Sequence, residues 1–216
     1  NAHGVLIGDY IYSKAFIYLV DIGNKKILKE LASTTNDIAQ GELVQLDAIN
    51  NVNITLNKLK KISYFKTGRL FEAAAKTGAI IANENKAFNY NVSECAKNLG
   101  ILFQIIDDLL DYSDSKKIGK PVFQDIKEGK VTYPFFYAYK NANTREKKRL
   151  KDLLGVSRDL KSKDLELIKS LEGIKKTKQL AEKYHIKAIE YAKKIKNLDI
   201  RKEMIELADT ALNRDK

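Results

Sequence analysis

The sequence is poor in the residues that build disulfide frameworks and zinc sites. Its one cysteine, Cys95, permits neither an internal disulfide nor a thiolate metal site, so we expect a reducing, cytoplasmic environment. The two histidines, His3 and His185, are too few and too far apart for a zinc motif. Only two prolines, Pro121 and Pro134, interrupt a chain that is rich in helix formers and lacks strand-like alternation. The predicted fold class is all-α.

Long apolar runs are also missing. None approaches the roughly 18 residues that a membrane span needs, and no signal peptide is recognisable. Charge is abundant, because 39 basic residues stand against 28 acidic ones, a net charge of +11. This excess favours nucleic acid, an anionic membrane surface or small polyanionic substrates as partners. A nucleic-acid-binding helical protein should gather its basic residues on one face, whereas the lysines here are spread through the C-terminal half, so we expect no nucleic-acid partner.

The stretch Leu99–Tyr112, LGILFQIIDDLLDY, holds the most distinctive polar pattern. At about 100° per residue, Gln104, Asp107, Asp108 and Asp111 share one face of a helix, and nearly all the rest is apolar. A helix that is apolar around most of its circumference is expected to be buried, so the polar stripe must face an internal cavity. Adjacent carboxylates need a cation, and oxygen ligands suit Mg²⁺ shared with substrate phosphates. We therefore predict a metal–phosphate site; a surface helix with a solvated acidic end is the alternative.

The chain before this stretch reads as helices separated by polar or glycine-containing breaks. We expect helices over 5–21, 26–47 and 55–82, and a polar break over 83–91. The opening segment VLIGDYIYSKAFIYLV is typical of a core helix rather than of a free terminus, and we expect residues before Asn1 to be missing from this sequence. Small residues in the third helix should let neighbouring helices approach closely: Gly68, Ala73, Ala74, Ala75, Gly78 and Ala79.

The segment after Tyr112 has no helical period and is rich in lysine. We interpret it as a flap that brings ammonium groups over a phosphate held beside the carboxylates, because loops of this length in compact domains are often lids. A solvated basic loop is the alternative. The lysines concerned are Lys116, Lys117, Lys120, Lys127 and Lys130.

From Phe135 onward the pattern is helical throughout. We expect a helix from Ser162 to Leu171 with Gly173 as its stop. Apolar residues then recur at three- and four-residue spacing beneath a lysine-rich outer face, with His185 on the surface. These recurring residues predict packing rather than chemistry: Leu180, Ala181, Tyr184, Ala188, Ala192 and Ile195.

Several segments follow one another in a recognisable order. Those before the carboxylate stretch read VLIGDY at 5–10, AQGELVQL at 39–46 and KTGRLF at 66–71. The carboxylate stretch itself contains GILFQIIDDLLD, and after it come GKP at 119–121, Asp125, GK at 129–130 and TYP at 132–134. This set resembles the trans-isoprenyl diphosphate synthase family, in its polyprenyl and octaprenyl form. A DDxxD pattern alone would be weak evidence, whereas the ordered set extends from Val5 to Pro134.

The resemblance implies a single all-α prenyl synthase domain over residues 1–216, in which a bundle of helices surrounds a deep central cavity. It also implies a homodimer. The implied reaction is the Mg²⁺-dependent condensation of isopentenyl diphosphate with an allylic diphosphate such as farnesyl diphosphate. Membrane contact would be peripheral at most and would come through the product.

The resemblance assigns the acidic residues to the metal. Asp107 matches the best direct Mg²⁺ ligand, Asp111 lies one turn away and Asp108 is nearby. Asp125 would act through a water molecule. Together they would hold the Mg²⁺ that neutralises a diphosphate leaving group.

The resemblance assigns the basic and neutral polar residues to the allylic diphosphate. Lys66, Lys120 and Lys130 match positions that contact its phosphates. Thr67 and Gln104 match polar positions that face the reacting carbons, where hydroxyl and carbonyl dipoles stabilise a carbocation. Lys66, Thr67 and Gln104 form the expected catalytic set.

One part of the family's pattern has no match. The first aspartate-rich motif, normally N-terminal to the GDY helix, is absent, and so are the Arg and Lys residues that bind isopentenyl diphosphate. A protein that begins at Asn1 would hold half of the metal site and should be inactive, which leaves an inactive regulatory subunit as an alternative. We expect instead that the motif is missing from this sequence. A measured mass equal to that of the sequence would contradict this expectation.

The AQGELVQL segment bears on product length. Farnesyl and geranylgeranyl synthases usually carry a GGQ-type stretch at this place. The form found here looks more like synthases of long, octaprenyl-like polyprenyl chains of about C35 to C45, which are precursors of quinone side chains. A short-chain synthase, making geranyl, farnesyl or geranylgeranyl diphosphate, is the alternative.

Overall fold

The structure is a computed structural model that describes residues 2–113, 123–156 and 162–214. These residues form helices joined by short connections, and no strand occurs among them, which confirms the all-α prediction. The first half contains α1 (Ala2–Asp21), α2 (Lys25–Leu46), α3 (Leu56–Ser63), the π-helical turn η1 (Tyr64–Gly68), α4 (Arg69–Ile81) and α5 (Lys86–Leu110). The second half contains α7 (Gln124–Lys127), α8 (Tyr133–Asn141), α9 (Thr144–Lys151), α10 (Ser162–Ser170), α11 (Gly173–Ala192) and α12 (Leu198–Leu212).

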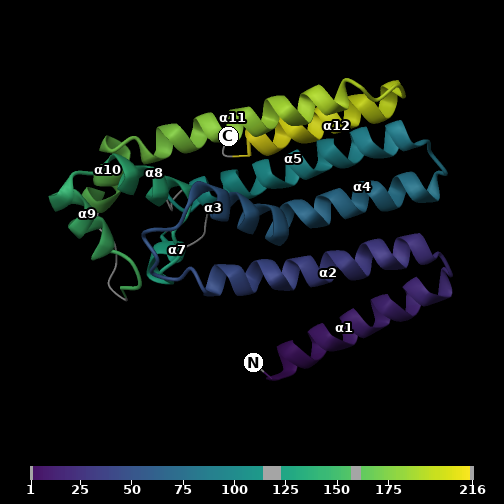
Figure 1. The fold of residues 1–216 in the computed structure, drawn as a ribbon, viewed down its shortest axis with the longest axis horizontal. Coiled ribbons are helices and arrows are strands. Elements are labelled where there is room, and N and C mark those ends of the chain that lie inside the picture. The colour runs from purple at the N-terminus through teal and green to yellow at the C-terminus, as the bar shows by residue number, and fades with distance from the viewer. Residues whose placement is uncertain (1, 114–122, 157–161, 215–216) are drawn as a thin grey trace.

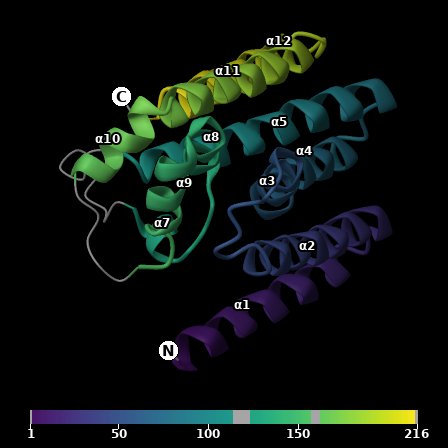
Figure 2. The same cartoon turned by 60° about the vertical axis from the view of Figure 1, so that its left-hand side comes forward.

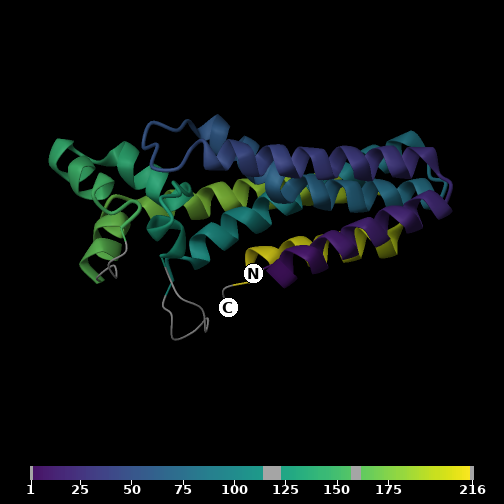
Figure 3. The ribbon, with the colours of Figure 1, turned by 90° about the horizontal axis from the view of Figure 1, so that it is seen from below.

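The long helices lie side by side, with α5 in the middle of the stack (Figure 1). α11 and α4 pack along α5 from opposite sides, α12 lies against α11 and α5, and α2 covers α4 and η1. Figure 3 shows that the axes of the long helices are roughly aligned, whereas the short helices gather at one end. That end receives the C-terminal end of α5, which carries the carboxylates (Figure 2).

α5 is buried along most of its length, as its apolar composition predicts. Leu102 and Ile105 are fully shielded from solvent. The helix begins at Lys86, so the polar break expected over 83–91 was too long. Asn85 is the physical reason, because its side chain accepts a hydrogen bond from the Phe88 backbone N–H at 3.0 Å and caps the helix there.

The helix expected over 55–82 is present, but it is not regular. Thr55 caps its start by accepting a hydrogen bond from the Lys58 backbone N–H at 3.2 Å. Between Tyr64 and Gly68 the chain widens into the π-helical turn η1 and then continues as α4. Hydrophobic periodicity does not reveal such a local change of pitch, although π-helical turns are frequent at functional sites.

α1 differs from the core helix that its sequence predicts. None of its residues is buried by the described chain, and it packs on the outer side of α2 as the last layer of the stack (Figure 1). The prediction was wrong for the chain as described, because no element covers the outer face of α1. The exposed apolar residues are Val5, Leu6, Ile7, Tyr10, Ile11, Tyr12, Ile17, Tyr18 and Val20.

The C-terminal helices confirm the predicted packing and correct one boundary. Gly173 starts α11 instead of stopping α10, and the left-handed turn residue is Glu172 with φ 59°. Glycine is needed at 173 because a side chain there would collide with the Pro134 carbonyl oxygen. His185 is partly buried, and its Nε2 lies 2.6 Å from Asp209 Oδ1 on α12. The residues predicted to pack are all buried: Leu180, Ala181, Tyr184, Ala188, Ala192 and Ile195.

No helix in the described ranges is both long and apolar enough to span a bilayer.

Candidate active site

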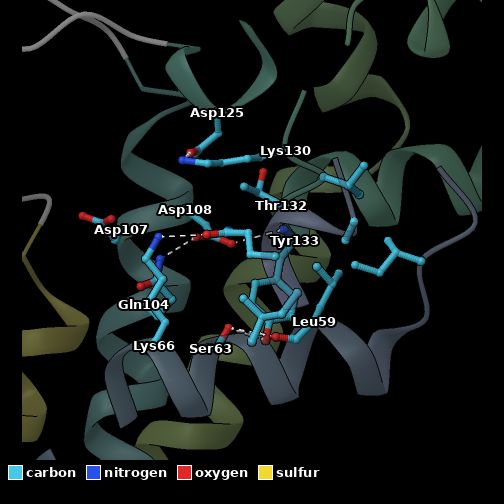
Figure 4. A pocket seen from close by; sticks show the side chains of 15 residues that line it. Leu59, Ser63, Lys66, Gln104, Asp107, Asp108, Asp125, Lys130, Thr132 and Tyr133 are labelled. Carbon is cyan, nitrogen blue, oxygen red and sulfur yellow. Dashed lines mark hydrogen bonds and ion pairs between the residues drawn. The ribbon is translucent and has the colours of Figure 1, made fainter. Parts of the chain in front are cut away.

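A small pocket lies where the C-terminal part of α5 meets α3, η1 and the segment that leads from α7 into α8 (Figure 4). Its volume is about 60 Å³, which is room for a few water molecules or a hydrated ion. Apolar side chains line one part of the wall: Ala48, Ile54, Leu59, Ile62 and Val131. Polar side chains line the rest: Gln45, Ser63, Lys66, Gln104, Asp107, Asp108, Asp125, Lys130, Thr132 and Tyr133.

A line of hydrogen bonds crosses the pocket wall from η1 to α8. Thr67 Oγ1 donates to Gln104 Oε1 at 2.7 Å, and Gln104 Nε2 donates to Asp108 Oδ1 at 2.9 Å. The backbone N–H of Tyr133 donates to Asp108 Oδ2 at 3.3 Å. Because an ionised carboxylate can only accept, the Gln104 amide must turn its NH₂ group to Asp108 and its oxygen to Thr67. Thr67 and Gln104, which the family resemblance assigns to the reacting carbons, are thus hydrogen-bonded to each other.

Two glycines make this contact between η1 and α5 possible. A Cβ atom on Gly100 would lie 2.7 Å from Gly68 Cα, and one on Gly68 would lie 3.0 Å from Ile101 Cγ1. The helices approach at a distance that only glycine permits, and this brings Thr67 within reach of Gln104. The prediction of close helix approach is confirmed at Gly68. It is wrong at Gly78, where an added Cβ would meet nothing within 4 Å.

Asp108 is the buried member of the carboxylate pair. The residue is 7% exposed, and both of its oxygens accept hydrogen bonds. Burial raises the pKa of Asp108 to about 7, and the nearby charges of Asp125 and Asp107 raise it further. The hydrogen bond from Gln104 acts in the opposite direction and lowers this pKa. Asp108 is therefore arranged to hold Gln104 and the start of α8 in place.

Asp107 is arranged differently, one residue away on the helix. Its side chain is 54% exposed at the edge of the pocket, and Oδ1 lies 4.0 Å from Arg214 Nη1. Arg214 follows α12 and its guanidinium lies over the Phe103 ring, 4.3 Å from the ring centre. An exposed ion pair of this length is weak, so the Asp107 carboxylate is available to a stronger cation.

Asp111 and Asp125 are joined through the backbone of α7. Asp111 Oδ1 accepts from the Gln124 N–H at 2.9 Å, and Oδ2 accepts from the Asp125 N–H at 3.2 Å. Burial raises the pKa of Asp111 to about 6, and the charge of Asp125 adds to the rise. Burial also raises the pKa of Asp125, although Lys130 and Lys66 oppose it. This concentration of partly buried carboxylates favours a bound cation.

Of the lysines predicted from the sequence, Lys66 and Lys130 line the pocket, whereas Lys127 does not. Lys66 Nζ donates to Gln45 Oε1 at 3.0 Å and lies 3.6 Å from Glu42 Oε1, both on α2. Lys130 Nζ lies 3.7 Å from Asp125 Oδ1 (Figure 4), and Lys130 also pairs with Glu128. Lys120 falls outside the described residues, and so do Lys116 and Lys117 of the predicted flap.

The carboxylates do not form a ready-made metal cage. Across residues 2–113, 123–156 and 162–214, no group of three or more acidic, histidine or cysteine side chains is placed to hold a metal ion. Asp107, Asp108 and Asp125 all line the pocket, but Asp108, like Asp111, uses its oxygens for hydrogen bonds. Mg²⁺ at phosphate sites takes one or two carboxylates and completes its shell with water and substrate. The residues present fit a Mg²⁺ ion that arrives with a diphosphate.

Sequence reasoning missed Ser63, Tyr133 and Gln45. Ser63 Oγ and Tyr133 Oη lie 2.9 Å apart in the pocket wall, and Gln45 receives the Lys66 ammonium. The backbone N–H of Tyr133 reaches Asp108, and a backbone role leaves no signal in the side-chain sequence. Gln45 lies within the AQGELVQL segment, so the family resemblance did include this residue. We interpreted the segment as an indication of product length and did not predict the contact of Gln45 with Lys66.

An all-helical stack with a polar pocket at the end of its central helix defines the class of helical isoprenoid synthases, and comparison with known proteins makes this specific. The polyprenyl synthetase family model matches residues 1–171, and the chain belongs to that family. A polyprenyl synthase structure from Caulobacter crescentus, described as complexed with calcium and isoprenyl diphosphate, aligns with a TM-score of 0.90 and 32% identity. That alignment covers 100% of this chain and 67% of the other.

Curated relatives are similar over different lengths. Octaprenyl diphosphate synthase of Escherichia coli is 41% identical over 139 residues, which are 64% of this chain and 43% of that protein. A short chain isoprenyl diphosphate synthase of Methanocaldococcus jannaschii is 39% identical over 216 residues, 97% of this chain and 65% of that protein. The chain thus spans less than half of the octaprenyl relative.

Proposed function

We propose that this chain carries the allylic-diphosphate side of an Mg²⁺-dependent trans-prenyltransferase that joins isopentenyl diphosphate to an allylic diphosphate. The observation that carries the proposal is that two lysines, the carboxylates of Asp107 and Asp125, and Gln104 line one small pocket, and that Thr67 is hydrogen-bonded to Gln104. The lysines would bind a diphosphate, and the carboxylates would bind its metal ion. The neutral Thr67–Gln104 pair lies beside them and would face the reacting carbon. Membership of the polyprenyl synthetase family supports the same reaction.

The ammonium groups of Lys66 and Lys130 bind the diphosphate. They reach the pocket from η1 and from the segment after α7, so they can contact phosphate oxygens from different directions. As the allylic C–O bond breaks, its electron pair goes to the diphosphate, and the two positive charges stabilise the negative charge that develops there. Their present partners, Gln45, Glu42 and Glu128, hold them ready before substrate binds.

Asp107 and Asp125 are the residues that would hold Mg²⁺, with Asp111 close behind Asp107 on the same helix face. When bound, Mg²⁺ supplies positive charge that makes diphosphate a better leaving group. Asp108 keeps Gln104 oriented, and Asp111 fixes the first turn of α7, which carries Asp125. All four acidic residues predicted from the sequence thus serve the metal, two of them through their neighbours.

The Thr67–Gln104 pair faces the carbon that becomes a cation. Its oxygen dipoles offset positive charge on the allylic group without capturing it irreversibly. The alkene of isopentenyl diphosphate then forms the new C–C bond, and loss of a proton restores a double bond. Because Gln104 is anchored by Asp108, the dipole does not have to reorient during the reaction.

We propose a long polyprenyl product of the octaprenyl type. The name of the Escherichia coli relative supports this choice, and the AQGELVQL segment agrees with it. The short-chain relative from Methanocaldococcus jannaschii, which aligns with more of this chain, keeps a short product as the second candidate.

We also propose that a second copy of the protein covers the outer face of α1. Folded monomers rarely expose apolar patches this extended, and a two-fold related copy offers a self-complementary partner. Light scattering after size exclusion should give a dimer. Ile11→Glu should shift it to a monomer, whereas Lys151→Glu, at an exposed position of α9, should not. A monomeric wild type at micromolar concentration would contradict this part of the proposal.

Turnover is the test of the reaction. The full-length protein is incubated with Mg²⁺, farnesyl diphosphate and labelled isopentenyl diphosphate, and the dephosphorylated products are separated by chromatography. We expect an Mg²⁺-dependent ladder that ends in a long polyprenol, while an end at C15 or C20 would favour the short-chain candidate. Absence of any condensation product, in protein of verified mass and fold, would favour an inactive regulatory subunit.

A further inference from the structure

A network of charged and polar side chains lies between α2 and α4, away from the pocket. Arg69 is its centre and is 7% exposed. Its Nε donates to Asp37 Oδ2 at 2.8 Å, and its Nη1 donates to Glu30 Oε1 at 2.6 Å, so one guanidinium joins two carboxylates of α2. The fork of the guanidinium suits such a double contact, which a lysine could not reproduce.

Glu72 connects this centre to other residues. Its Oε2 accepts a hydrogen bond from the Tyr64 hydroxyl at 2.6 Å and lies 3.7 Å from Arg69 Nη1. Lys76 Nζ approaches Oε1 to 2.7 Å. Burial works to raise the pKa of Glu72, but the hydrogen bonds from Lys76 and Tyr64 and the charge of Arg69 hold it below the usual value. Glu72 is therefore ionised and bound from several sides.

The network brackets η1 in the sequence. Tyr64 is the first residue of the π-helical turn, and Arg69 is the residue directly after its end. Both bind Glu72, which lies on the first turn of α4. The two ends of the turn are thus tied to one carboxylate. Lys66, which lines the pocket, and Thr67, which donates a hydrogen bond to the pocket residue Gln104, lie between them.

Close packing fixes the turn from its other sides. On α2, a Cβ atom added to Gly41 would lie 2.8 Å from Phe65 Cβ and 3.1 Å from Lys66 N. On α5, Gly100 lies against Gly68, as described above. The turn therefore has close contacts with α2 on one flank and with α5 on the other, in addition to the charged network. A π-helical turn is rare because it is intrinsically less favourable than α-helix, so its surroundings must hold it.

We propose that the Tyr64–Glu72–Arg69 network is a clamp that maintains the π-helical turn and thereby positions Lys66 and Thr67 for the substrate. Tyr64, Glu72 and Arg69 are positioning residues, since none of them lines the pocket. Without the clamp, the segment would relax toward regular α-helix, and the rotation would turn Lys66 and Thr67 away from their partners. The effect on turnover rests on the proposed function, whereas the effect on the turn does not.

Mild variants test the clamp, because removing Arg69 would leave buried carboxylates unpaired and unfold the protein. Tyr64→Phe deletes a single hydroxyl, and Glu72→Gln keeps the shape of the side chain. Tyr184→Phe on α11 is the matched control for the first and Glu182→Gln on α11 for the second. Hydrogen exchange, read by mass spectrometry on peptides that cover 64–68, reports the turn directly in the full-length protein.

We expect both variants to exchange at least about 10-fold faster at 64–68, while peptides of α5 and α11 keep their wild-type rates. Turnover at saturating substrate should fall about 10- to 100-fold, because small displacements of positioning groups have effects of this size. Both controls should match the wild type. Equal acceleration of exchange in every helix would mean a merely structural role and would overturn the clamp.

The readouts separate the clamp from the proposed function. Faster exchange at 64–68 with wild-type turnover would also overturn the clamp, since the turn would then position nothing. If the wild type itself shows no turnover, Mg²⁺-dependent binding of inorganic diphosphate replaces it as the readout. Weaker diphosphate binding in Tyr64→Phe would support the clamp in that case, and unchanged binding would contradict it.

Discussion

Thr67 Oγ1 and Gln104 Oε1 lie 2.7 Å apart although the two residues are separated by 37 positions in the sequence. Thr67 comes from the π-helical turn and Gln104 from the buried helix α5, and the close approach of Gly68 and Gly100 joins them. Gln104 continues to Asp108 and Asp108 to the start of α8. The Thr67–Gln104 pair and the Asp108 carboxylate are therefore held by one continuous set of contacts.

Replacing the Thr67 hydroxyl should slow the reaction without unfolding the protein. Thr67→Val keeps the branched shape and loses the hydrogen bond to Gln104, so we expect turnover to fall by about 100-fold, the size seen when one stabilising dipole is lost. Thr67→Ser keeps the hydroxyl and should retain most of the activity. Steady-state kinetics with both variants checks this, and equal loss in Val and Ser variants would point to packing instead of the hydroxyl.

Asp107 should be essential for turnover and dispensable for folding. Its side chain is 54% exposed, so Asp107→Ala should keep the thermal unfolding midpoint and the helical circular dichroism of the wild type. We expect turnover to fall by more than about 100-fold, because Mg²⁺ loses its most accessible carboxylate. Asp152→Asn, at an exposed position after α9, is the control. Wild-type turnover in Asp107→Ala would contradict the assignment of Asp107 to the metal site.

The glycine contact at Gly100 should matter for stability, in contrast to Gly78. A methyl group at 100 would meet Gly68 Cα at 2.7 Å, and we expect Gly100→Ala to lower the free energy of unfolding by about 1–3 kcal/mol. Gly78→Ala meets nothing within 4 Å and should raise it by about 0.5–1 kcal/mol through helix propensity. Denaturant unfolding measures both changes. A stable Gly100→Ala would show that the two helices can separate at no cost.

Divalent-cation binding should depend on pH in a defined direction. Burial raises the pKa of Asp108 to about 7 and that of Asp111 to about 6, so without metal both take up protons as the pH falls through these values. A bound cation requires the charged forms, and Mg²⁺ affinity should therefore weaken from pH 8 to pH 5 and release protons on binding. Calorimetry in buffers of different ionisation enthalpy counts these protons. Affinity that is constant over this range would contradict the expectation.

The same shifts determine how these groups affect the metal-free protein. In the unfolded chain Asp108 and Asp111 ionise near the ordinary pKa of 3.8, whereas in the folded protein they keep their protons to higher pH. The folded state binds more protons between about pH 4 and pH 7, so their contribution to the free energy of unfolding falls as the pH rises through that window. Denaturant unfolding with and without Mg²⁺ should show this fall and its reversal by the metal.

The fold was predictable where burial follows from the helix itself. α5 is apolar around most of its circumference, and any helix of that composition must be covered. α1 is equally apolar, yet it is exposed in the described chain, because what covers a helix is not encoded in its own residues. Glycine occurs at 173 because the Pro134 carbonyl oxygen leaves no room for a side chain. A rule that treats glycine as a helix stop cannot anticipate this packing contact.

Several residues that line the pocket could be named from the sequence, but their geometry could not: Lys66, Gln104, Asp107, Asp108, Asp125 and Lys130. Asp107 and Asp108 are neighbours in the sequence, but one is exposed and the other is bound on both oxygens. The difference depends on Tyr133, which belongs to another helix. The π-helical turn that presents Lys66 and Thr67 depends on Glu72 and Arg69, which have no motif of their own, and long-range contacts of this kind appear only in three dimensions.

The central claim is that this pocket binds an allylic diphosphate through Mg²⁺ and lysine charge, and calorimetric titration of farnesyl diphosphate tests it most directly. The full-length wild type is compared with Lys66→Ala in Mg²⁺ and in excess chelator. We predict binding in Mg²⁺ that weakens at least about 10-fold in chelator and also in the Lys66→Ala variant. Equal affinity with and without Mg²⁺, together with no change in Lys66→Ala, would contradict the account.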